Sequence, residues 1–94
     1  MNQVDRPVAA QVKITNRRGL HARASAKFVK MAERFKAQVQ VSKDGTDVPG
    51  TSIMGLMLLA AAPGDHIHIK AEGADATEAL DALVQLVEQK FHED

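Results

Sequence analysis

The sequence predicts an α+β fold in which three helices cover one face of a four-stranded antiparallel sheet. Short segments with an apolar residue at every second position alternate with segments whose apolar residues recur every three or four positions, in the order β-α-β-β-α-β-α. Every predicted strand has only one apolar face, so the opposite face of the sheet should be exposed to water. The helices are therefore expected on the apolar face, where they and the sheet enclose one core.

A change of period separates the first strand from the first helix. Apolar and polar residues alternate over residues 8–15, which predicts a half-buried strand. Gly19 interrupts this pattern, and a helical period follows over residues 24–35. The apolar face of this helix is expected to consist of Ala24, Phe28, Met31, Ala32 and Phe35.

An Asp-Gly pair marks a hairpin in the middle of the chain. Alternation returns over residues 37–41, and Asp44 and Gly45 follow it. Both central positions of a type I′ turn need a positive φ, which this pair favours. A short return strand is expected around residues 47–48.

Local signals also place the remaining elements. Thr51 or Ser52 can cap a short helix that continues through about Leu59. Alternation over residues 66–71 predicts the last strand. A long amphipathic helix follows over residues 74–91, with apolar residues at a helical spacing as far as residue 91.

Length and composition limit the class of protein. The 94 residues predict a single domain over residues 1–94, with residues 1–6 as a flexible tail and any site shallow and exposed. The 12 basic and 12 acidic residues argue against a nucleic-acid partner, and the absence of cysteine excludes disulfides and thiolate metal sites. No apolar run is long enough to span a bilayer, and no signal peptide is recognisable. We therefore expect a soluble, cytoplasmic monomer.

His21 stands at the joint between the first strand and the first helix. Free N–H groups and the positive dipole at a helix start favour a neutral ring, and they also stabilise an anion attached to it. Arg23 adds a guanidinium whose fork suits phosphoryl oxygens, Gly19 permits close approach of a partner, and Arg17 and Arg18 add positive charge. These are the requirements of a reversibly phosphorylated histidine. An exposed histidine at a helix start can equally be a simple loop residue or cap.

The segments GLHARASAKFVKMAERF and SIMGLMLLAAAPGDHI resemble the HPr family, the histidine-containing phosphocarriers of the bacterial phosphotransferase system. The resemblance implies an open-faced β-sandwich whose histidine, here His21, accepts a phosphoryl group on Nδ1 from phosphoenolpyruvate via enzyme I. The histidine then passes it to an enzyme IIA-type domain, and Arg23 matches the family's phosphate-site arginine. Such a carrier is a stoichiometric substrate and not an enzyme, and we expect no cofactor or metal. Ala24 departs from the proline that many members have, which should slightly loosen the helix start.

The second motif begins at Ser52, whose simplest role is to cap the short helix. The resemblance implies a further role, because the matching serine is phosphorylated in some bacteria by HPr kinase/phosphorylase. Ile53, Met54 and Met57 match an apolar docking patch for partner proteins, with Leu56 facing inward. Flexible methionines suit a surface that must fit several partners.

Other functions remain as alternatives or are excluded. A regulatory binding module of the same fold, acting through protein–protein contacts with His21 as a structural residue, is the main alternative. Within the family, the motifs do not separate the sugar-transport branch from the nitrogen-related branch, and we favour a regulatory role over bulk sugar uptake. An RNA-binding domain would need aromatic residues on its sheet, whereas the three phenylalanines fall on predicted helical faces. His66 and His68 share a strand face, but two imidazoles alone make a poor metal site, so we expect solvated side chains and no metal site.

Overall fold

The computed structural model describes residues 6–93. Apart from Arg6, the tail expected at residues 1–6 lies outside these residues. The elements follow the expected order β-α-β-β-α-β-α, and a short 3₁₀ turn is added at the end. They are β1 (Val8–Lys13), α1 (Ala22–Ala32), β2 (Gln38–Lys43), β3 (Thr46–Pro49), α2 (Ile53–Leu58), β4 (His66–Glu72), α3 (Ala76–Glu88) and η2 (Lys90–His92).

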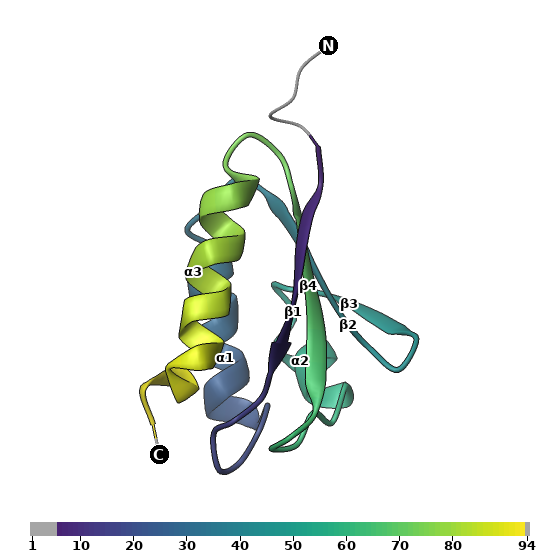
Figure 1. The fold of residues 1–94 in the computed structure, drawn as a ribbon, viewed down its shortest axis with the longest axis vertical. Helices are drawn as coiled ribbons and strands as arrows, with labels where there is room; N and C mark the ends of the chain where they lie inside the picture. The colour runs from purple at the N-terminus through teal and green to yellow at the C-terminus, as the bar shows by residue number, and fades with distance from the viewer. Residues whose placement is uncertain (1–5, 94) are drawn as a thin grey trace.

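The four strands form one sheet in the order β1-β4-β2-β3, and all neighbouring strands are antiparallel. Figure 1 shows α1 and α3 side by side along one face of this sheet, with α2 across the lower end of β2 and β4. The predicted α+β class and the position of the helices on one face are therefore confirmed.

The sheet has one dry face and one wet face because its side chains alternate. Along β4, Ile67, Ile69 and Ala71 are fully buried, and the residues between them are exposed. Ile69 lies opposite Ala10 of β1 and Val41 of β2, so apolar residues from neighbouring strands meet beneath the helices. The largest fully buried side chains are Phe28, Phe91, Ile14, Leu56, Ile67, Ile69 and Leu83.

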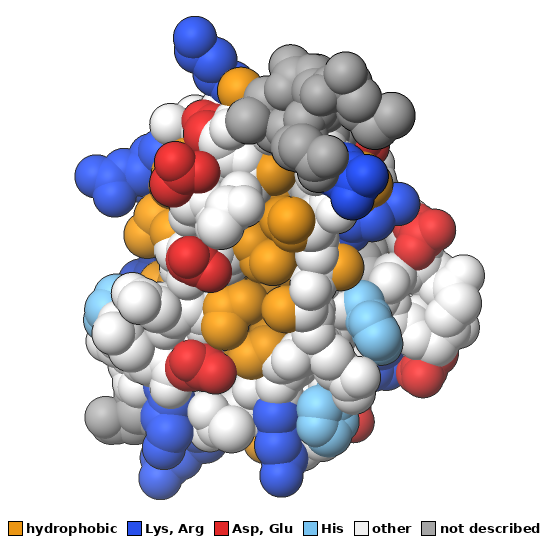
Figure 2. Space-filling model, turned by 45° about the horizontal axis from the view of Figure 1, so that its top comes forward, with side chains coloured by type: hydrophobic (Ala, Val, Ile, Leu, Met, Phe, Trp, Pro, Cys, Tyr) orange, Lys and Arg blue, Asp and Glu red, His pale blue; other side chains and the backbone are white. Residues whose placement is uncertain are grey.

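The apolar face continues to the surface between β1 and α3. Figure 2 shows a band of hydrophobic side chains there, bordered by charged side chains on α3. Val8 and Ala10 of β1 and Val84 of α3 are partly buried and pack against the core. The edge strand β1 is thus covered by α3 along one face only.

The hairpin between β2 and β3 forms as predicted. Asp44 has a φ of 51° and Gly45 a φ of 83°, which are the positive values that a type I′ turn requires. Lys43 and Thr46 are paired directly across the turn.

The end of the last helix differs from the prediction. The helix begins at Ala76 and ends at Glu88, rather than extending from 74 to 91. Lys90, Phe91 and His92 then adopt positive φ values of 57°, 56° and 59°. Phe91 is nevertheless fully buried in the core. The left-handed turn directs its ring inward, as a helix extended to residue 91 would also have done. The apolar spacing therefore predicted the burial of Phe91 correctly, but the helical backbone conformation that it predicted at this residue is wrong.

Two further boundaries are also shifted. Helix α1 covers Ala22–Ala32, so Phe35 packs against the core from the loop that follows it. Asp75 is the N-cap residue of α3, but its side chain makes no cap bond there. Its carboxylate accepts hydrogen bonds from the backbone N–H groups of Lys36 at 2.9 Å and Ala37 at 2.8 Å, and so fixes the entry to β2.

Gly19 joins the loop before α1 to the loop after α2. Its φ is 65°, and a Cβ at this position would lie 2.2 Å from the carbonyl oxygen of Ala61. The neighbouring N–H of Leu20 donates to that same oxygen at 2.9 Å. Only glycine fits both the backbone conformation and the space.

Replacing Gly19 with alanine should lower the free energy of unfolding by about 2 kcal/mol or more, because left-handed strain is added to a backbone clash. Gly45→Ala is the matched control: its φ is also positive, but nothing lies within 4 Å of an added Cβ. The control should lose only about 1 kcal/mol. Urea unfolding of both variants measures the difference, and equal losses would contradict the close contact.

Candidate functional site

His21 is the N-cap residue of α1. Its backbone is extended, and its carbonyl oxygen accepts the first helical hydrogen bond, from Ser25 N–H at 2.9 Å. Its ring Nδ1 accepts the N–H of Arg23 at 3.3 Å. The ring therefore caps the helix, as the simpler interpretation of the sequence proposed. The same geometry directs the lone pair of Nδ1 toward the positive end of the helix.

The other ring nitrogen of His21 faces a residue that sequence reasoning missed. Nε2 lies 2.8 Å from Oε1 of Glu93, which is 72 residues away along the chain. Asn16, fully buried, donates from Nδ2 to the same carboxylate oxygen at 3.1 Å and to the carbonyl oxygen of Gly19 at 2.9 Å. No local pattern in the sequence indicates this contact, because the two residues are far apart along the chain.

The pKa of Glu93 is held below its usual range. The hydrogen bond to His21 is the largest cause, and the bond from Asn16 and the electrostatic influence of His21 and Lys27 act in the same direction. Desolvation opposes them. The carboxylate of Glu93 is therefore the favoured form at neutral pH.

A shallow cavity of about 290 Å³ opens beside the ring. It is lined by Arg17, Arg18, His21, Arg23 and Glu93. The structure thus brings together Arg17, Arg18 and Arg23, whose relative directions the sequence left open. Within residues 6–93, no carboxylate lies within 4.0 Å of any of these guanidinium groups. Among the described residues, none of these three cations is therefore engaged in an ion pair, and each can offer donors to an anion.

Ser52 and the predicted docking residues lie on α2. Ser52 is the N-cap, and its Oγ accepts the N–H of Gly55 at 2.9 Å. Leu56 is fully buried, as expected. The exposed apolar side chains form a surface that we call the α2 patch, which consists of Ile53, Met54, Met57 and Leu58.

Leu58 was not among the predicted docking residues, although it is 77% exposed and Met54 is 75% exposed. Helix α2 has six residues and packs only one face against the core, and Leu56 lies on that face. Figure 1 shows the start of α1, α2 and the C-terminal end of the chain at the same end of the molecule. The arginine-lined cavity and the α2 patch therefore share one end of the fold.

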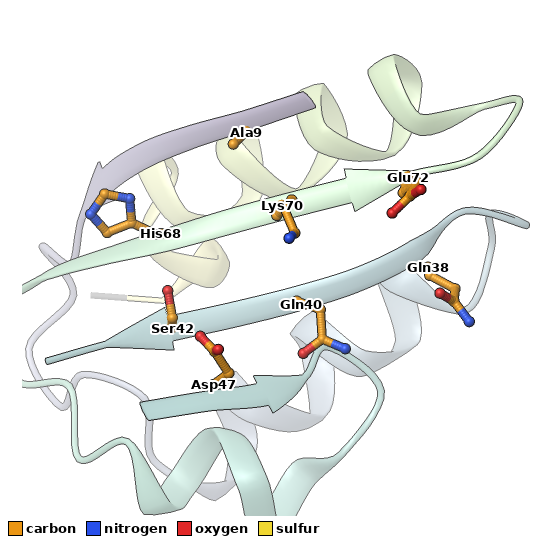
Figure 3. Close-up of a pocket in the computed structure, with 8 residues that line it drawn as sticks. All are labelled: Ala9, Gln38, Gln40, Ser42, Asp47, His68, Lys70 and Glu72. Atoms are coloured by element: carbon orange, nitrogen blue, oxygen red, sulfur yellow. The ribbon is translucent and has the colours of Figure 1, made fainter. Parts of the chain in front are cut away.

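A larger cavity of about 530 Å³ lies elsewhere, on the wet face of the sheet. Figure 3 shows its polar side chains standing on β2, β3 and β4, with His68 near Ser42 and Lys70 between the two central strands. None of the predicted site residues lines it. Over residues 6–93, no three His, Asp or Glu side chains come together in a way that could hold a metal ion.

In the part of the chain that the structure describes, no helix has the length and apolar character needed to cross a bilayer.

Comparisons with known proteins point to one family. A family model described as "PTS HPr component phosphorylation site" matches residues 8–89. Phosphocarrier protein HPr of Neisseria meningitidis serogroup B is 50% identical over 82 residues, which cover 87% of this chain and 92% of that protein. The corresponding protein of Pseudomonas aeruginosa is 46% identical over 86 residues, which cover 90% of this chain and 96% of the relative.

The fold agrees equally well with solved structures. The crystal structure of HPr-C-His from Thermoanaerobacter tengcongensis superposes with a TM-score of 0.89 at 44% identity and covers 93% of this chain and 98% of that one. The fold and these matches place the chain in the phosphocarrier class. The chain belongs to the HPr family of the phosphotransferase system. It is a phosphocarrier, a protein substrate of other enzymes and not itself an enzyme.

The lowered pKa of Glu93 makes stability depend on pH. The ionised carboxylate stabilises the fold above its ordinary pKa of 4.5, and this contribution is lost as the pH falls through the lower pKa of the folded state. Glu93→Gln should therefore be less stable than the wild type at pH 7, and the difference should shrink toward pH 3. Chemical unfolding at the two pH values measures it.

Glu88→Gln changes an exposed carboxylate for which the described part of the chain shows no ion pair, and it is the matched control. If the difference in unfolding free energy between the wild type and Glu93→Gln stays constant between pH 7 and pH 3, the stabilising contact of the Glu93 carboxylate is contradicted.

Proposed function

We propose that Nδ1 of His21 accepts a phosphoryl group from phosphoenolpyruvate via enzyme I and passes it to an enzyme IIA-type domain. The observation that carries this proposal is the position of Nδ1, which accepts the N–H of Arg23 at the start of α1 beside the arginine-lined cavity. A lone pair there is both available for attack and surrounded by groups that stabilise an anion.

The phosphoryl group would be stabilised in two ways. The free N–H groups at the start of α1 favour negative charge there. Guanidinium groups lining the cavity can each offer paired donors to phosphoryl oxygens, and Arg23 lies in the first turn of the same helix. During transfer the N–P bond forms as the bond between phosphorus and the donor breaks, and the bonding pair leaves with the donor. Most of the catalytic stabilisation would come from the active site of the partner.

The α2 patch supports docking of these partners. Met54 and Leu58 are more than 70% exposed, and Ile53 and Met57 are each about two-fifths exposed. Exposed apolar side chains of this size on so small a protein indicate an interaction surface. Since the patch and His21 lie at the same end of the fold, a partner bound to the patch would face the ring. Enzyme I and the IIA-type domain would use this surface in turn.

We further propose that Ser52 is a regulatory phosphorylation site for HPr kinase/phosphorylase. Its hydroxyl caps α2 and is partly exposed, next to Ile53 of the patch. A phosphate at a helix N-terminus is compatible with the fold, because the helix dipole favours its charge. Two negative charges beside an apolar docking surface would instead oppose partner binding.

The cellular setting follows from the same proposal. We infer a single domain over residues 1–94 that acts as a monomer in the cytoplasm. The family match over residues 8–89 supports this inference.

A regulatory binding module is the second candidate. The HPr-like protein Crh of Halalkalibacterium halodurans is 42% identical over 83 residues. The solution structure of Crh, the catabolite repression HPr of Bacillus subtilis, matches this fold with a TM-score of 0.63 at 42% identity. His21, with its capping geometry and three neighbouring arginines, favours the carrier. The acceptor that takes the group from His21 would separate the sugar-transport branch from the nitrogen-related branch.

Incubation with enzyme I and labelled phosphoenolpyruvate should place acid-labile, base-stable label on the wild type. His21→Ala should carry none, because the attacking nitrogen is missing. His66→Ala removes an exposed imidazole on the wet face and should label as the wild type does. Equal labelling of His21→Ala and the wild type would overturn the assignment.

Incubation with ATP and purified HPr kinase/phosphorylase should give an acid-stable phosphate on the wild type and none on Ser52→Ala. Thr51→Ala, which changes the neighbouring exposed hydroxyl, is the matched control and should retain the label. An unlabelled wild type, or label that persists in Ser52→Ala, would refute the regulatory site.

A further inference from the structure

The two nitrogens of the His21 ring have partners of opposite character. Nδ1 faces a donor, the N–H of Arg23, at 3.3 Å. Nε2 faces an acceptor, the carboxylate of Glu93, at 2.8 Å. A neutral imidazole has one N–H and one lone pair, so both contacts are satisfied only when the proton is on Nε2. The surroundings of the ring thus select the tautomer in which Nδ1 is unprotonated and its lone pair accepts the N–H of Arg23.

Glu93 is held in place by several independent contacts. The fully buried amide of Asn16 donates to its Oε1 at 3.1 Å. The preceding residues Lys90–His92 form a left-handed turn with φ between 56° and 59°, a conformation that costs non-glycine residues free energy. Buried Phe91 anchors this turn, and Lys27 Nζ donates to the Phe91 carbonyl oxygen at 2.7 Å. Strain of this kind persists only where surrounding contacts determine the conformation.

We propose that Glu93 is a positioning residue for His21: its carboxylate keeps the proton on Nε2, and it stabilises the positive charge that the ring acquires when Nδ1 takes the phosphoryl group. This inference rests on the proposed role of His21 as acceptor. It adds a residue that lies beyond the segment 8–89 matched by the family model.

The charge changes during transfer explain why a carboxylate is suited to this position. Before transfer, Nδ1 is unprotonated and Nε2–H donates to Glu93, and the hydrogen bond from Arg23 N–H to Nδ1 must give way as the phosphoryl group arrives. As the N–P bond forms and the bond to the donor breaks, the ring keeps its Nε2 proton and becomes positively charged. A carboxylate 2.8 Å from Nε2 interacts more strongly with this charged ring than with the neutral one. It therefore favours the phosphorylated state. In the same way, the carboxylate of a hydrolase triad orients its histidine and stabilises the positively charged ring.

The test combines ring spectroscopy with transfer kinetics on the whole protein. In the wild type, the ¹⁵N shifts of His21 should show a protonated Nε2 and an unprotonated Nδ1. In Glu93→Ala and Glu93→Gln the two shifts should move toward each other. The turnover of enzyme I with these variants should fall about tenfold, with little change in KM. A tenfold loss corresponds to the free energy of about one hydrogen bond to a charged group. Glu88→Gln should match the wild type in both measurements.

A second pair of variants tests the support of Glu93 while leaving Glu93 itself in place. Lys27→Met removes the hydrogen bond to the Phe91 carbonyl oxygen, and it should produce the same changes in smaller size. Lys30→Met removes an exposed cation from the same helix and should have no effect.

The outcomes separate this proposal from the one on which it rests. If the wild type is labelled on His21 and the Glu93 variants show wild-type ring shifts or wild-type turnover, the positioning role is overturned and the acceptor assignment stands. A loss of turnover without a change in the ring shifts also overturns it, because Glu93 would then act by another route. If the wild type takes no label on His21, both proposals fail.

Discussion

The close approach between the Gly19–Leu20 backbone and the carbonyl group of Ala61 is the constraint on which the site depends. Leu20 N–H donates to this carbonyl group, and the absence of a Cβ on Gly19 leaves room for it. The contact joins the loop that carries His21 to the loop that follows α2. A phosphocarrier must present a reactive nitrogen and a docking surface to the same partner, and this backbone contact keeps the two features at one end of the sheet.

Helix capping and phosphoryl chemistry use the same physical property in this protein. His21 and Ser52 each accept a backbone N–H at a helix start, Nδ1 from Arg23 and Oγ from Gly55. Unpaired N–H groups that need a cap also attract phosphate. The structural and the chemical interpretations of each residue are therefore compatible. In both cases the side chain is partly exposed, so that it can cap the helix and still be reached by a partner.

Local patterns predicted most of the fold and part of the site. The alternation in β4 and the Asp-Gly turn were predicted correctly, because each depends on residues only a few positions apart. The predicted end of α3 was wrong. The position of Phe91 in the sequence fits a helical face, but a left-handed turn brings the residue to the core instead. The carboxylate of Asp75, at the start of α3, binds the backbone just before β2, and no local pattern predicts this contact. Spacing shows which side chains are buried and leaves open the backbone path that buries them.

The sequence by itself determined the class of fold, the joint at which His21 stands and the cations near it. These features depend on periodicity, turn chemistry and neighbours in the chain. Only the tertiary structure decided that Arg17, Arg18 and Arg23 line one cavity, that Leu58 extends the α2 patch, and that Glu93 meets the ring of His21. The last contact joins residues 72 positions apart through a strained turn and a buried amide. No local pattern encodes such a contact, because it depends on how α3 packs beside α1 and on where the chain leaves that helix.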